Sequence, residues 1–366
     1  MSRVRTIAGK IETPEREPIA QTSARTFTRR ATLVAAGVGT AAAALGLAVR
    51  FNRETPRGYV AAALDIMQKY SYRQGQVDWA RVRATALAEA ASATTFAETY
   101  PAIRAALERL GDRHSHLLTP ARTEQLSGRS PAQPSAPKVE RLGAVGYIMV
   151  PSFASINNEA GSRFALELQR MIQAVDAGDL AGWIVDLRTN GGGNMWPMIA
   201  GLGPVVGDGL LGAFVGPAGR NSWRTEWWYE NGTAGERDPQ TDQRSQNGYA
   251  ISVGDRPYRL LNPGPAVAVL TGHQTGSSGE AVCVAFRGRP RTRSFGAATA
   301  GLSTSNSLFS LSDGAVLALT VAVMADRTGR VYGDAIEPDE VVVGKRKRNI
   351  AEDPAVLAAS AWLRGG

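Results

Sequence analysis

The chain has 366 residues, of which 43% are hydrophobic and 20% are charged. This length can bury the cores of two or three domains, and this balance excludes an intrinsically disordered chain. The formal net charge is +8, but no basic helix with interleaved aromatic residues and no zinc or base-stacking module accompanies it. Nucleic acid is therefore not an expected partner. Cys283 is the only cysteine, which excludes an intrachain disulfide and a cysteine-based metal site.

The N-terminal region has the pattern of a targeting or anchoring segment. Residues 31–49 form an uncharged, alanine-rich run that follows a basic stretch. A run of this length can cross a bilayer, and its basic flank remains cytoplasmic. Thr28-Arg29-Arg30 also resembles a twin-arginine export signal. We predict a basic cytoplasmic tail over 1–30, then a membrane anchor or a cleaved signal over 31–49, with a buried helix as the alternative. Either of the first two places the following residues outside the cytoplasm, in the periplasm or at the cell surface.

The next segment has a helical pattern. Apolar residues recur every three or four positions over 59–110, and Pro101 suits the first turn of the last helix. We predict a small helical bundle over 55–126, which ends in a loop at 111–120. The composition of residues 127–138, rich in serine and proline, predicts a linker.

Residues 139–366 alternate between predicted strands and helices. Strand–turn–helix units of this kind indicate an α/β or α+β core with a partly parallel sheet. The apolar runs Gly182–Leu187 and Pro265–Leu270 are typical of strands buried on both faces. The tryptophan-rich segment Phe214–Leu260 is predicted to be an irregular or hairpin excursion, such as a lid. The other predicted elements are strands at 145–150 and 316–324 and helices at 157–177, 195–201 and 278–287.

One strand-to-helix turn carries a candidate nucleophile. The segment Val269–Glu280 passes from a buried strand through small residues, including Gly276, Ser277 and Ser278, into a helix. A serine at such a turn lies where free backbone N–H groups stabilise negative charge. Acyl transfer needs a nucleophile and an oxyanion donor in this arrangement. The same residues also suit an ordinary helix cap, so this segment alone leaves both interpretations open.

Two further segments carry chemically useful residues. Asp186–Gly193 ends in three glycines directly after a buried strand, where a loop can present amides to an oxyanion or a phosphate or form a plain turn. It lacks the lysine of a nucleotide-binding P-loop. Gly111–Leu117 holds His114 and His116, which could supply a general base or ligate a metal. No third cluster of metal ligands accompanies the two histidines, so no metal site is expected.

Together with Ile336–Glu340 and Asp353-Pro354, these segments resemble the C-terminal processing (tail-specific) and tricorn-type serine peptidases. The resemblance covers about 110–363. It implies a serine-type endopeptidase that needs no cofactor and cuts peptide or protein substrates near their C-terminal tails. The family nucleophile precedes the motif glutamate by three residues, which here is Ser277, with Ser278 as the alternative.

The resemblance also implies the other site residues. One branch of the family uses a lysine downstream of the nucleophile, and residues 296–305 contain none. The histidine-using branches carry His followed by Ser or Thr, which favours His114 over His116 as the base. The expected oxyanion donors are the amides of Gly192 and Ser278. The glycines expected to line the binding site are Gly191, Gly193 and Gly276.

Two departures from the family pattern affect these expectations. The segment between the histidine loop and the first core strand is too short for the usual peptide-binding PDZ module, so the architecture is most similar to the branch of the nisin resistance protein. Tyr332 stands where tricorn-type enzymes carry a glutamate. We therefore expect a Ser–His pair, with Asp112 or Asp334 as the group that orients the imidazole. A non-catalytic peptide- or ligand-binding protein on the same fold and an esterase are the alternative functions.

Overall fold

The computed structural model has all its described residues within one compact unit, Ala35–Gly366. The predicted tail at 1–30 and the predicted anchor or signal at 31–49 lie outside the described residues, as does most of the predicted linker at 127–138. Within the described part of the chain, no helix is long and apolar enough to cross a membrane. The described residues are 55–127, 136–155, 157–219, 222–241 and 250–365.

The helices predicted over 59–110 are present. Helix α1 begins after Thr55, whose hydroxyl accepts a hydrogen bond from the Gly58 N–H at 3.1 Å, and a proline in the first turn suits such a start. The apolar faces of these helices pack together in a core cluster that also includes strand residues such as Leu117 and Leu317. The helices of this region are α1 (Pro56–Tyr70), α2 (Trp79–Glu89), α3 (Tyr100–Glu108) and α4 (Pro120–Ser127).

The expected loop at 111–120 contains a strand, β1 (His116–Leu118), which corrects the sequence-based prediction. This strand pairs antiparallel with β12 (Val316–Asp326), where Leu117 lies opposite Leu317. Both of these leucines are buried. A three-residue strand has too little pattern of its own to be recognised, because its partner lies some two hundred residues away.

The mixed sheet of the core confirms the expected partly parallel sheet. Its order is β13-β10-β9-β4-β3-β2, and every neighbouring pair is parallel except β2 with β3. All residues of β4 and β9 are buried, as their continuous apolar sequences predicted. The strands are β2 (Lys138–Leu142), β3 (Val145–Met149), β4 (Gly182–Asp186), β9 (Val267–Thr271), β10 (Thr292–Gly296) and β13 (Glu340–Val341).

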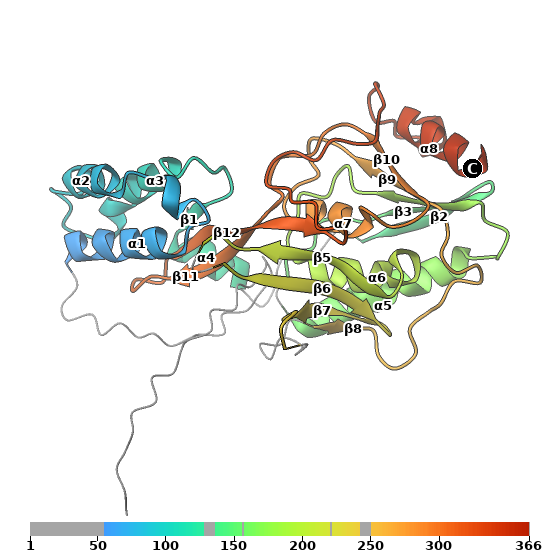
Figure 1. The fold of residues 1–366 in the computed structure, drawn as a ribbon, viewed down its shortest axis with the longest axis horizontal. Helices are drawn as coiled ribbons and strands as arrows, with labels where there is room; N and C mark the ends of the chain where they lie inside the picture. The colour runs from blue at the N-terminus through green and yellow to red at the C-terminus, as the bar shows by residue number, and fades with distance from the viewer. Residues whose placement is uncertain (1–54, 128–135, 156, 220–221, 242–249, 366) are drawn as a thin grey trace, which may run out of the picture. The chain divides into compact units, whose positions relative to one another are not determined.

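The segment Phe214–Leu260 forms antiparallel hairpin strands, as one of its predicted forms, but these strands belong to a second sheet and not to a lid. Strands β5, β6, β7 and β8 lie side by side and continue onto β12 in an antiparallel sheet (Figure 1). Trp227 is fully buried against Phe214, with ring centroids 4.5 Å apart. This tryptophan therefore belongs to the core and not to a movable cover. The additional strands are β5 (Gly209–Val215), β6 (Arg224–Glu230), β7 (Thr233–Arg237), β8 (Ile251–Ser252) and β11 (Thr304–Ser310).

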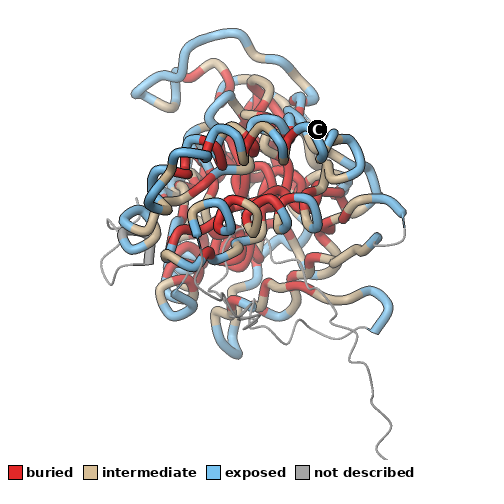
Figure 2. The backbone as a smooth tube through the Cα atoms, turned by 90° about the vertical axis from the view of Figure 1, so that its left-hand side faces the viewer, coloured by how far each residue is buried: buried red, intermediate tan, exposed pale blue. Residues whose placement is uncertain are grey.

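Helices fill the space between the two sheets. The largest core cluster combines residues of α5 (Asn158–Val175), α6 (Met195–Val206) and α7 (Ser278–Phe286) with residues of both sheets. Helix α8 (Pro354–Gly365) covers the opposite face of the mixed sheet. The buried segments accordingly gather in the interior, with exposed turns around them (Figure 2).

Strand β12 connects the helical region to this core. Leu317 and Leu319 pack into the cluster of the N-terminal helices, whereas Val321 and Met324 pack into the central cluster. All eleven residues of the strand are buried. One continuous strand therefore holds β1, and the histidine loop before it, against the core.

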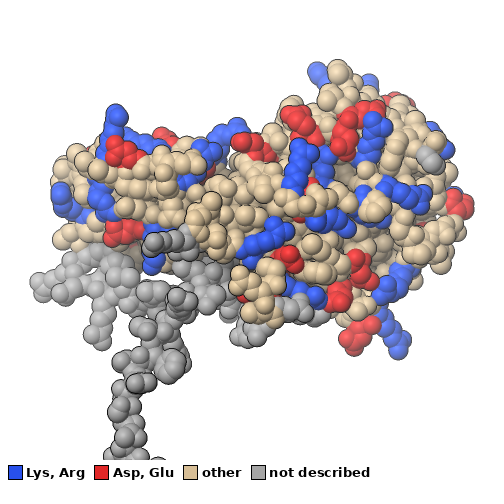
Figure 3. Space-filling view, viewed as in Figure 1, with Lys and Arg blue, Asp and Glu red and all other residues tan. Residues whose placement is uncertain are grey.

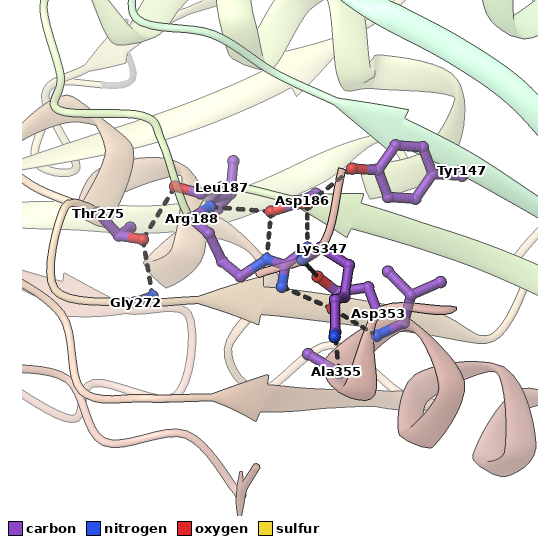
Figure 4. A network of polar contacts seen from close by, with 10 residues as sticks. Tyr147, Asp186, Leu187, Arg188, Gly272, Thr275, Lys347, Asp353 and Ala355 are labelled. Atoms are coloured by element: carbon purple, nitrogen blue, oxygen red, sulfur yellow. Dashed lines mark hydrogen bonds and ion pairs between the residues drawn. The ribbon is translucent and has the colours of Figure 1, made fainter. Parts of the chain in front are cut away.

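A buried ionic network fixes the loop that follows β4 (Figure 4). Arg188 donates to both oxygens of Asp186, at 3.0 and 2.7 Å, and to Asp353 at 2.8 Å. Asp353 also caps α8 by accepting from the Ala355 N–H at 3.1 Å. Although burial acts to raise it, the Lys347 amide and the Arg188 guanidinium hold the pKa of Asp353 below its ordinary value.

We predict that Asp353→Ala destabilises the protein by about 3 kcal/mol, because it leaves the Arg188 charge buried with one partner fewer and removes a helix cap. Asp179→Ala is the matched control, since Asp179 pairs with Arg141 at the surface. Urea unfolding followed by circular dichroism measures both variants. Equal unfolding midpoints for the two would contradict a structural role for the network.

Candidate active site

Ser277 occupies a strained turn directly before α7. Its φ of 51° and ψ of −118° lie in a region that L-residues rarely adopt, and such strain is typical of functional positions. The side chain is largely buried, and the residue stands at the N-terminus of a nine-residue helix. A hydroxyl in this place faces the positive end of the helix dipole, which favours developing negative charge.

Ser278, the alternative nucleophile, is engaged elsewhere. Its hydroxyl donates to the Gly193 carbonyl at 2.5 Å. The neighbouring Gly276 N–H donates to the Asn190 carbonyl at 3.0 Å. These two bonds join the nucleophile turn to the glycine loop, and they tie the Ser278 hydroxyl to that loop, which favours Ser277 as the nucleophile.

Gly192 lies against the nucleophile with no room for a side chain. A Cβ built on this glycine would be 2.9 Å from the Ser277 Cβ and 3.1 Å from the Ser278 nitrogen. Its φ of +110° also requires glycine. Its N–H donates to Asn190 Oδ1 at 3.0 Å, so this expected oxyanion donor is engaged here. The Ser278 N–H makes no hydrogen bond within the described part of the chain.

The other expected glycines hold the loop in shape. Gly191 donates its N–H to Ser152 Oγ at 2.9 Å. A Cβ on Gly193 would lie only 2.2 Å from the Phe153 carbonyl oxygen. The glycine loop is therefore clamped between the segment after β3 and the nucleophile turn, and its amides are held in fixed directions.

Glu280 fastens the nucleophile turn to the segment after β10. Its carboxylate accepts from the Ser277 N–H at 2.8 Å and from the Thr299 hydroxyl at 2.5 Å. It also accepts from the N–H groups of Gly301, at 3.0 Å, and Leu302, at 2.9 Å. Burial raises the pKa of Glu280, and these donors act in the opposite direction.

Asp112 shapes the histidine loop. Its carboxylate accepts from the backbone N–H of His114 at 3.0 Å and of Ser115 at 2.6 Å, and from Thr320 Oγ1 on β12 at 3.1 Å. Asn306 Nδ2 on β11 donates to the His114 carbonyl at 2.9 Å. Asp112 thus orients the loop backbone, whereas we expected it to orient the imidazole.

The Thr304 side chain contacts the His114 ring. The Nδ1 atom lies 2.7 Å from Thr304 Oγ1, and Asp334, the other expected partner, meets Ser303 through its backbone carbonyl. Burial, followed by the nearby charge of His116, lowers the pKa of His114 from 6.5 to about 4, and Asp112 opposes this. The imidazole is therefore neutral near pH 7, with Nε2 left for a further partner.

His116 has a different environment from His114. It begins β1, its side chain is exposed, and its Nδ1 lies 2.8 Å from the His114 carbonyl oxygen. Within the described residues, no group of three or more His, Cys, Asp and Glu side chains is arranged to hold a metal.

One segment, residues 299–304, touches both candidate groups. Its first part binds the Glu280 carboxylate, and Ala300 donates its N–H to the Thr275 carbonyl at 2.8 Å. A Cβ on Gly301 would lie 2.5 Å from the Arg113 guanidinium, and Thr304 meets His114. The nucleophile turn and the histidine loop are thus fixed to the same short segment, although no hydrogen bond joins Ser277 to His114 in the described part of the chain.

Sequence reasoning did not identify Thr304, Asn306 or Asn190. The first two are ordinary strand residues, and their roles arise only when β11 pairs with β12 beside the histidine loop. Asn190 carried a signal, since it stands within the Asp186–Gly193 segment and amide side chains favour turns.

Comparison with known proteins agrees with this architecture. Residues 144–342 match Peptidase family S41. A nisin-resistance protein of Lactococcus lactis is 29% identical over 286 residues, which cover 78% of this chain and 83% of the relative. A solved lipoprotein of Streptococcus agalactiae superposes with a TM-score of 0.63 at 24% identity, over 85% of this chain and 96% of that one. The solved structure of mature CPAF superposes with a TM-score of 0.51 at 12% identity, over 85% and 95%.

The mixed sheet and the serine turn define the class of the protein as a serine-peptidase-like α/β fold. Because the family match covers more than half of the chain, the protein belongs to Peptidase family S41. The two solved structures support the shared fold.

The strain at Ser277 makes a prediction about stability. We expect Ser277→Gly to be more stable than Ser277→Ala by about 1 kcal/mol, because only glycine adopts this backbone conformation without cost. At the helical position Ser278, the order should reverse, with the alanine variant the more stable. Thermal unfolding of the four variants tests the predicted order of stability at each of the two positions. The same order at both positions would refute backbone strain at the nucleophile.

Proposed function

We propose that this protein is a serine endopeptidase in which Ser277 is the nucleophile and His114 is the general base. The observation that carries the proposal is the strained Ser277 turn at the start of α7, which Glu280 fixes to the segment that also holds His114 through Thr304. Such a turn supplies a nucleophile and an oxyanion donor together.

The proposed reaction begins with the neutral imidazole. In the tautomer that donates from Nδ1 to Thr304, the Nε2 atom accepts the Ser277 proton as the hydroxyl attacks a peptide carbonyl. The Ser278 N–H binds the oxyanion. Gly192 adds a second donor if its amide turns from Asn190 to the substrate, as catalytic hydrogen bonds often tighten only with substrate bound. His114 then protonates the leaving amine, and water hydrolyses the acyl-enzyme.

We propose C-terminal tails of peptides or proteins as the substrates, on the strength of the family resemblance. Because one relative is named a nisin-resistance protein, nisin is a further substrate to test. We also propose that the peptidase region acts outside the cytoplasm. This rests on the uncharged run at 31–49 and on the similarity to a protein described as a lipoprotein.

Variants of the three candidate side chains test the reaction. We expect Ser277→Ala and His114→Ala each to lower kcat/KM at least about 1,000-fold, as for serine peptidases in which the two residues act as a unit. The exposed His116→Ala should retain most of the activity. The assay is mass-spectrometric detection of cleavage in peptides with free or amidated C-termini, with nisin included. A fully active Ser277→Ala would exclude the mechanism.

The same assay separates the alternative functions. A non-catalytic binding protein predicts that wild type and Ser277→Ala bind peptides equally and that neither cuts them. An esterase predicts cleavage of ester substrates and none of the matching peptides.

The lowered pKa of His114 predicts how the activity depends on pH. His114 must be neutral to accept a proton, and its pKa is lowered to about 4. Activity should therefore persist as pH falls through 6.5 and disappear only near pH 4. A profile of kcat/KM against pH measures this, with circular dichroism at each pH to confirm folding. A limb at or above pH 6.5 would show that the general base is not a His114 with a lowered pKa.

A further inference from the structure

A cavity with an unusual charge lies at the far end of α7. The segment Arg287–Arg293, which runs from the end of α7 into β10, has an arginine at every second position. All four of these arginines line a cavity of about 550 Å³, together with Asp339 and Trp362. Basic and acidic side chains are interspersed over the face seen in Figure 3. The cavity differs, since a single carboxylate stands among four arginines.

The one carboxylate of the cavity is already engaged. Asp339 accepts from Arg287 Nη1 at 2.7 Å and from the N–H and hydroxyl of Ser294 at 2.7 and 2.8 Å. Arg293 pairs at 3.3 Å with Glu340, which does not line the cavity. Asp339 therefore neutralises Arg287, and within the described residues Arg289 and Arg291 have no carboxylate partner.

Of the two arginines without a carboxylate partner, Arg289 is the buried one. Only 9% of it is exposed, and its guanidinium donates to the carbonyls of Val206, Pro265 and Pro290 and to Thr292 Oγ1. Within the described residues, no carboxylate pairs with it. Burial, with the nearby charges of Arg327 and Arg291, lowers the pKa of Arg289 to about 10.

Other groups nearby have unused donors. The Nε atoms of Arg287 and Arg327 are buried and have no hydrogen-bond partner in the described chain. Arg291 is exposed, and the one hydrogen-bond contact of its guanidinium among the described residues is long, 3.5 Å to the Gly264 carbonyl. A buried positive charge with incomplete pairing is costly, and a bound anion is one explanation for it.

We propose that this cavity binds an oxyanion of the phosphate class, either free phosphate or the phosphate headgroup of an anionic lipid. Guanidinium groups match the geometry of phosphate oxygens. A ligand with two negative charges balances Arg289 and Arg291 together. The site is separate from the proposed catalytic centre, because Ser277 lies at the other end of α7, and a nine-residue helix is about 14 Å long.

The test compares the full chain with three arginine variants. Arg291→Asn removes an exposed guanidinium and suits the φ of 54° at this position, because asparagine tolerates positive φ. Arg163→Ser, on the exposed face of α5, is the matched control for loss of one charge. Arg289→Gln is a third variant, used where its unfolding temperature in chloride equals that of the wild type.

Two measurements distinguish the sources of the ligand. Thermal unfolding in potassium phosphate, against potassium chloride of equal ionic strength, measures binding of the free ion through the stabilisation it causes. Co-sedimentation with phosphatidylglycerol vesicles, against phosphatidylcholine vesicles, measures binding of a headgroup.

We expect binding by the wild type and Arg163→Ser and at least tenfold weaker binding by Arg291→Asn. If phosphate gives this pattern, the ligand is the free ion, and if only phosphatidylglycerol gives it, the ligand is a headgroup. Absence of binding in both measurements, or equal binding by wild type and Arg291→Asn, would overturn the proposal.

Discussion

The site depends on the hydrogen bonds that the buried carboxylate of Glu280 accepts. The carboxylate holds the Ser277 amide on one side and the Thr299 hydroxyl and the Gly301 and Leu302 amides on the other. A buried carboxylate is stable only when donors surround it. The nucleophile turn and the segment that leads to Thr304 must therefore form together, and the position of His114 relative to Ser277 follows from this shared anchor.

The order of strands explains why the chemistry gathers at one edge. Strands β4 and β9 are parallel neighbours, so the loops that follow them leave the sheet at the same end. One of these loops holds the glycines 191–193 and the other holds Ser277. The Asp186–Arg188–Asp353 network then fixes the start of the first loop to α8, and hydrogen bonds from Gly276 and Ser278 close the two loops on each other.

The sequence predicted the elements that have strong local patterns. Continuous apolar runs identified β4 and β9, and small residues between a strand and a helix identified the Ser277 turn. It did not predict β1 or the sheet of β5 to β8, because short antiparallel strands depend on distant partners and tryptophans such as Trp227 also occur in loops. Thr304 was missed for a related reason. Nothing in its local sequence distinguishes it, and its contact with His114 exists only through the pairing of β11 with β12.

The group that contacts His114 Nδ1 affects the pKa of the imidazole and therefore its strength as a base. A carboxylate there would favour the protonated imidazole and raise its pKa. The neutral hydroxyl of Thr304 supplies no such charge, so burial and the nearby His116 dominate and the pKa falls to about 4. A base this weak is always neutral near pH 7, yet it has little driving force for accepting the serine proton. In the proposed mechanism, the positive end of the α7 dipole therefore assists the imidazole by stabilising the negative charge that develops at Ser277.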